Sequence, residues 1–155
     1  MNNSEFKNLM ACIPTCVAVI WGTTNSGSVF GCTISSLVSI SIQPENEEVL
    51  FVLKKSSHTG AKLRECQTFK ISVLEENQSH IAKKFSERFP SNENSRVNHF
   101  DDWSNDVVSE FTLELIGEYE REASILFVAK VIKIFHTQDA KPLVYLDRSY
   151  KRIKR

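Results

Sequence analysis

The sequence lacks a net charge and any long hydrophobic run, and each absence excludes a class of protein. Lys plus Arg and Asp plus Glu both number 19 in 155 residues, so the formal net charge at pH 7 is zero. This balance gives no support for a broad surface that binds nucleic acid or membranes. The longest apolar runs, such as residues 16–21, are too short to span a bilayer, and the start has no apolar signal region. We therefore expect a cytoplasmic protein with no nucleic-acid or membrane partner.

Cysteines are few, and they do not form a pattern typical of a metal site. Cys12, Cys16, Cys32 and Cys66 are expected to be free thiols in a cytosolic chain. Cys12 and Cys16 are spaced as two metal ligands could be, but no compact cysteine–histidine pair follows, so we expect no metal site. The chain also lacks repeats and low-complexity linkers. Its length and its apolar content of 41% suit a single domain, residues 1–155.

Alternating apolar and polar residues predict a chain made mainly of strands. In one expected strand, Val38, Ile40 and Ile42 should point to one face; in another, Tyr119 should share the half-buried face with Leu113. A turn is expected at residues 25–28. The expected strands cover residues 16–24, 29–35, 38–42, 49–54, 68–74, 111–119 and 124–135, with a short pair within 143–153.

A leading helical turn and two short helices are expected between the strands. The turn covers residues 5–12; one helix covers 56–64 and begins with Ser56 or Ser57 as its N-cap. The other covers 77–89 and presents one apolar face through Ile81, Phe85 and Phe89. Residues 90–105 read as a polar loop. A closed or nearly closed antiparallel barrel fits this order because it removes exposed strand edges.

Two hydroxyl-rich segments are candidates for ligand binding. Thr33, Ile34, Ser35 and Ser36 give a strand region with small side chains, so a flat ring system could lie against its main chain. Residues 54–59, KKSSHT, offer two lysines and three hydroxyls beside a helix start, which suits a phosphate monoester. Taken alone, each segment also fits an ordinary turn or helix cap. No acid, base or nucleophile cluster accompanies them.

Five short motifs follow one another along the chain. They are PTCVAVI at residues 14–20, GCTISSLVSIS at 31–41, KKSSHT at 54–59, FKISVL at 69–74 and AKKFS at 82–86. In this order they resemble the flavin reductase-like family, over residues 13–143. The resemblance implies a mainly β fold, an antiparallel split β-barrel (the FMN-binding split barrel, Greek-key) with a few short helices. It also implies a homodimer with flavin near the subunit interface.

The resemblance implies NAD(P)H-dependent reduction of FMN or FAD, which could supply reduced flavin to a partner monooxygenase. The flavin ring and ribityl chain would lie on Thr33, Ile34, Ser35 and Ser36. The phosphate would lie at the lysine-and-serine turn, on Lys54, Lys55, Ser56, Ser57 and Thr59. Hydride transfer needs no catalytic acid or base, because the cofactor carries the chemistry and the protein positions two rings.

Three positions depart from the family's pattern, and the first is Cys16, which stands in place of a glycine. Ser124 stands where many members carry a histidine near the nicotinamide; a hydroxyl can bond to a carboxamide but cannot stack or carry charge as imidazole does. Leu146 stands where a polar residue or histidine is frequent. A carrier, sensor or electron-transfer protein that binds FMN without efficient NAD(P)H oxidation is therefore an alternative, and a barrel module without flavin is a third. His58 could touch the ligand, and Trp103 could be part of a lid or an anchor for its loop.

Overall fold

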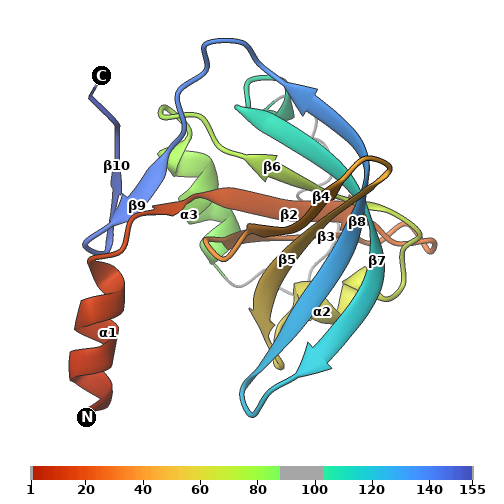
Figure 1. Ribbon diagram of the computed structural model, residues 1–155, viewed down its shortest axis with the longest axis horizontal. Coiled ribbons are helices and arrows are strands. Elements are labelled where there is room, and N and C mark those ends of the chain that lie inside the picture. Colours follow the sequence, from red (N-terminus) through yellow and green to blue (C-terminus); the bar gives the residue numbers. More distant parts are fainter. Residues whose placement is uncertain (1, 88–102, 155) are drawn as a thin grey trace.

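The computed structural model describes residues 2–87 and 103–154 and shows two antiparallel sheets with three helices among them (Figure 1). The larger sheet has seven strands in the order β3-β2-β6-β7-β8-β5-β4, and the smaller has the order β1-β9-β10. The strands are β1 Thr15–Cys16, β2 Ala18–Thr23, β3 Val29–Ile34, β4 Val38–Gln43, β5 Asn46–Lys54, β6 Phe69–Val73, β7 Ser109–Glu120, β8 Ser124–His136, β9 Val144–Leu146 and β10 Ser149–Lys151. The helices are α1 Asn3–Ala11, α2 His58–Leu63 and α3 Ser79–Ser86.

The seven-stranded sheet curls around the main hydrophobic core. Phe51 of β5 and Phe127 of β8 are fully buried and stack with ring centroids 5.4 Å apart. The segment after β3 returns to β5, where the Ser36 hydroxyl accepts a hydrogen bond from the Val52 N–H at 2.9 Å and donates one to its carbonyl at 3.3 Å. The strand order does not close from β4 back onto β3. The expected mainly β split barrel is therefore confirmed, as an open rather than a closed barrel.

A second core lies between the outer face of this sheet and α3. Ile81, Ala82 and Phe85 of α3 are buried there, as the apolar face of the expected helix required. Thr33 Oγ1 donates to the Ala82 carbonyl at 2.7 Å, which binds α3 to β3. A Cβ at Gly31 would lie 2.7 Å from the Phe85 ring, so the helix can approach the strand this closely because residue 31 is glycine.

The helix α1 projects from the body of the molecule (Figure 1). The Asn2 side chain caps it by accepting from the Ser4 N–H at 3.1 Å, and none of its residues is buried. Its C-terminal end is held against the small sheet, where the Asp147 N–H donates to the Ala11 carbonyl at 2.8 Å. Among the described residues, no helix combines the length and apolar character that a bilayer span needs.

Three β-bulges alter the expected strand patterns, and each inserts one isoleucine. Ile40 is extra in β4, Ile116 in β7 and Ile132 in β8; their relative exposures are 49%, 48% and 52%. The expectation that Val38, Ile40 and Ile42 share one face by simple alternation is wrong, because the bulge at Ile40 interrupts the period of two. The expected burial of Tyr119 is also wrong, since its exposure is 63%.

Two expectations concern the segment after α3. The helix ends at Ser86, so it is shorter than expected, and Phe89 and residues 90–102 lie outside the described residues. Trp103 packs against Trp21 and Phe85, with ring centroids 5.8 and 5.5 Å apart. Its carbonyl also accepts from the Gln78 side chain at 2.9 Å. Trp103 is thus an anchor on the second core.

Candidate functional site

In the strand segment expected to carry the flavin ring, most side chains contact other parts of the protein. Thr33 bonds to α3, Ile34 is only 5% exposed in the main core, and Ser36 bonds to Val52. Ser35 differs, because it is exposed in a bend directly after β3. A ligand on this segment would therefore meet the main chain of the bend and the Ser35 hydroxyl.

The lysine-and-serine turn begins where β5 ends. The exposed side chains of Lys54, Lys55 and Ser56 surround it, and the Lys55 N–H donates to the Ala123 carbonyl at 3.1 Å. Ser57 is the N-cap of α2; its hydroxyl accepts from the Gly60 N–H at 3.2 Å. Of the two serines expected as caps, Ser57 is therefore the one that caps the helix.

A contact between β3 and α2 brings the two segments together. Helix α2 contacts β3, and Thr59 of α2 is 3% exposed beside Cys32, one residue before Thr33. Burial raises the pKa of the Cys32 thiol to about 11. Segments more than 20 residues apart in the sequence thus meet at one end of the barrel.

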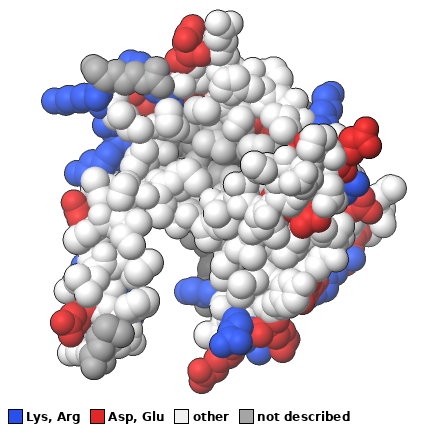
Figure 2. Space-filling view, in the orientation of Figure 1, with Lys and Arg blue, Asp and Glu red and all other residues white. Residues whose placement is uncertain are grey.

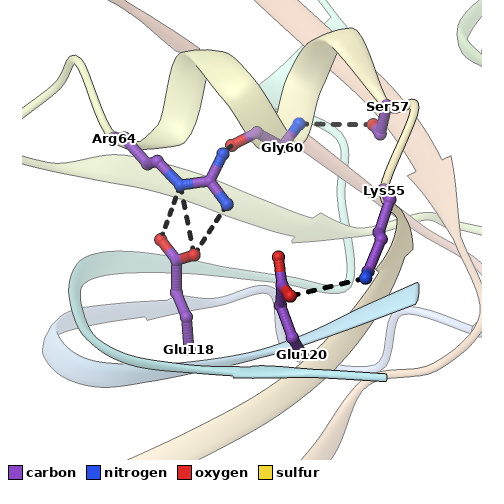
Figure 3. A network of polar contacts seen from close by, with 6 residues as sticks. All are labelled: Lys55, Ser57, Gly60, Arg64, Glu118 and Glu120. Atoms are coloured by element: carbon purple, nitrogen blue, oxygen red, sulfur yellow. Dashed lines mark hydrogen bonds and ion pairs between the residues drawn. The ribbon is translucent and has the colours of Figure 1, made fainter. Parts of the chain in front are cut away.

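Two cations at this end of the molecule have carboxylate partners (Figure 3). Lys55 Nζ lies 3.4 Å from Glu120 Oε2. Arg64, just after α2, makes a closer pair with Glu118: its Nε lies 2.9 and 3.1 Å from the two carboxylate oxygens and its Nη2 2.7 Å from one of them. Hydrogen bonding to Glu118 raises the pKa of Arg64, and its guanidinium lies 5.8 Å from the Phe127 ring centroid. Figure 2 shows charges of both signs gathered at this end of the molecule.

The bulge at Ile116 explains why the two glutamates point toward α2. Directly opposed residues of neighbouring strands share a face of the sheet. After the bulge, Glu118 lies opposite Phe127 and Glu120 opposite Ile125, and both of these partners are core residues. The sequence reasoning missed both glutamates, because strict alternation from Leu113 places Glu118 on the outer face.

Ser124 lies beside the lysine turn. It is half-buried at the start of β8 and directly opposite Lys54 of β5. Leu146 lies in the other sheet, opposite Ser149 of β10. His58 is exposed at the first position of α2. Within residues 2–87 and 103–154, no three His, Cys, Asp or Glu side chains are grouped as a metal site would require.

The chain is similar to known proteins over most of its length. Residues 10–154 match the sequence model of a family described as flavin reductase like domain. The chain is 24% identical to an actinorhodin polyketide dimerase from Streptomyces coelicolor over 148 residues, which are 93% of this chain and 82% of the relative.

Solved structures show the same fold. The styrene monooxygenase flavin reductase from Pseudomonas putida S12 superimposes with a TM-score of 0.82 at 24% identity, covering 97% of both chains. An NADH:FAD oxidoreductase from Streptomyces globisporus C-1027, in complex with NAD and FAD fragments, gives 0.84 at 19% identity and covers 99% of this chain and 93% of its own. Because the family match spans nearly all of the sequence, the chain belongs to the flavin reductase-like domain family of flavoprotein oxidoreductases.

Proposed function

We propose that this chain is an NAD(P)H:flavin oxidoreductase that reduces FMN or FAD. NAD(P)H would give up a hydride, and the flavin would take up that hydride and a proton. The observation that carries the proposal is that the small-residue bend at Ser35 lies next to the lysine-and-serine turn, because Ser36 is hydrogen-bonded to Val52 of β5 and α2 contacts β3. Family membership supports it.

Each residue of the turn has a defined part in this proposal. Lys54, Lys55 and Ser56 are exposed and could contact a phosphate directly. The Ser57 hydroxyl accepts from Gly60, so its own proton is available for a phosphate oxygen. Thr59 is buried against Cys32, so it would keep the turn in position on β3.

Two measurements on the purified protein test the proposal. Titration with FMN, FAD and riboflavin should change flavin fluorescence or absorbance, and addition of NADH or NADPH should bleach the bound flavin. In steady state, the protein should oxidise at least one nicotinamide nucleotide when flavin is present. Flavin binding without turnover in any combination would reject the reductase, and absence of flavin binding would reject any flavoprotein function.

A second candidate is a flavin carrier, sensor or electron-transfer protein without efficient NAD(P)H oxidation. Ser124 favours it, because a hydroxyl stands where many family members carry an imidazole. In this case dithionite, but not NADH or NADPH, would reduce the bound flavin. The Ser124→His variant would then gain NADH oxidation, whereas a wild type with full turnover would exclude this candidate.

The proposed partners and compartment follow from the same reasoning. We propose a homodimer, because apolar side chains are exposed on β4 and β8, including Ile42 at 80% and Ile134 at 55%. Reduced flavin could be delivered to a monooxygenase; a relative from Pseudomonas putida S12 is a styrene monooxygenase flavin reductase. A cytoplasmic location suits the four free cysteines.

A further inference from the structure

The carboxylates beside the lysine turn compete with the anion that the turn is proposed to bind. Glu120 forms an ion pair with Lys55, and Glu118 forms one with Arg64. The partners are 65 and 54 positions apart in the sequence. Both glutamates come from the end of β7, and the bulge at Ile116 turns them inward. A phosphate group at this turn would therefore meet one lysine, Lys55, that already has a counter-ion.

The two ion pairs differ in how easily a ligand could open them. Lys55 and Glu120 are joined by one contact of 3.4 Å, and their side chains are 41% and 72% exposed. Arg64 and Glu118 share three contacts of 2.7 to 3.1 Å, and the Arg64 Nη1 is also 3.5 Å from the Gly60 carbonyl. An exposed pair with a single contact is weak, whereas a guanidinium bound by both carboxylate oxygens is held in one geometry.

We propose that Glu120 is a built-in competitor for Lys55, which a ligand phosphate must displace, and that it sets selectivity among flavins. Arg64 stays with Glu118 and holds α2 on the barrel. This inference rests on the proposed flavin site. A phosphomonoester such as FMN carries nearly two negative charges at neutral pH, so it competes for Lys55 and is also repelled by Glu120. Riboflavin has no phosphate, so neither effect should change its affinity.

The test compares Glu120→Gln with wild type in binding FMN and riboflavin. The variant should bind FMN about two- to fivefold more tightly, the fold-change expected from releasing an exposed ion pair, while riboflavin affinity stays unchanged. The gain should shrink in high salt, which screens exposed charges. Glu114→Gln is the matched control: it removes the same charge from β7, but Glu114 lies opposite Lys130, away from the turn.

A double-mutant cycle shows whether Glu120 acts through Lys55. In a Lys55→Gln background, Glu120→Gln should improve FMN binding less than in the wild-type background, because only the direct repulsion of the phosphate then remains to be removed. The inference is overturned if Glu120→Gln leaves FMN affinity unchanged, improves riboflavin equally, or acts with the same strength without Lys55. If wild type binds neither FMN nor riboflavin, the proposed function itself fails and this inference fails with it.

Discussion

At the scale of single residues, buried hydroxyls connect neighbouring strands of the large sheet. Ser72 of β6 is fully buried; it accepts from Trp21 Nε1 at 2.9 Å and donates to Glu110 Oε2 at 3.0 Å. Glu110 also pairs with Lys70 Nζ at 2.6 Å, and Lys70 lies 4.8 Å from the Trp21 ring centroid. The Ser72 hydroxyl therefore connects β2, β6 and β7 in one network of polar side-chain contacts.

The Ser72→Ala change should lower the free energy of unfolding by about 1–3 kcal/mol, because it removes both hydrogen bonds of a fully buried hydroxyl. Urea unfolding followed by tryptophan fluorescence measures this loss. Ser39→Ala, at an exposed position of β4, is the control and should stay within about 0.5 kcal/mol of wild type. Equal stability of the two variants would contradict the assigned role of Ser72.

At the scale of elements, the strands could be predicted from the sequence. The face of the sheet on which the side chains near the strand ends lie could not be predicted. Alternation and turn residues gave β2, β3, β5, β6 and β8 within a few residues, and the four-residue spacing of Ile81 and Phe85 gave the buried face of α3. The two site segments were recognisable because their small and basic residues are contiguous. A bulge, however, reverses the facing of every later residue in a strand.

The missed part of the site follows from that reversal. Glu118 and Glu120 face α2 because Ile116 is an extra residue in β7. The bulge depends on how β7 packs against β8, and the one signal for it in SEFTLELIGEYE is Gly117, because a glycine inside a strand often accompanies a bulge. The partners of the two ion pairs are separated by 54 and 65 positions in the sequence, so the pairs can be expected only when the register of the sheet is known.

The seating of α3 on β3 gives a second stability prediction. Gly31→Ala should cost about 1–3 kcal/mol, because the new methyl group would lie 2.7 Å from the Phe85 ring and 3.0 Å from the Ile20 carbonyl. Phe85→Leu in the same chain should recover part of this loss, so the two changes should be non-additive in thermal or urea unfolding.

Gly117→Ala is the control for this prediction. A Cβ at Gly117 would have Val128 as its nearest neighbour at 3.6 Å, an ordinary van der Waals contact, so the change should be nearly neutral. If Gly31→Ala were tolerated as well as Gly117→Ala, close packing of α3 on β3 would not be what requires a glycine there.

At the scale of the whole molecule, the exposed isoleucines of the open barrel bear on the proposed homodimer. Ile40 and Ile132 are bulged residues on β4 and β8, the two strands that flank β5. Sedimentation velocity should show wild type as a dimer, and Ile132→Asp should shift it toward monomer, because an unpaired charge would be buried at the interface.

Gln138→Asp adds the same charge at an exposed position beyond β8 and should leave the dimer intact. Circular dichroism should show that both variants remain folded. A wild type that sediments as a monomer would contradict the homodimer, and a dimeric Ile132→Asp variant would place the interface on another surface.

The pairing of β1 with β9 has a consequence for synthesis of the chain on the ribosome. Thr15 is opposite Tyr145, so its partner is translated 130 residues later (145 minus 15). At about 5–20 residues per second, the early segment waits roughly 7–26 s for it. A nascent polypeptide can form the β2–β3 hairpin early, but the three-stranded sheet beside α1 is completed only after β9 and β10 have been synthesised.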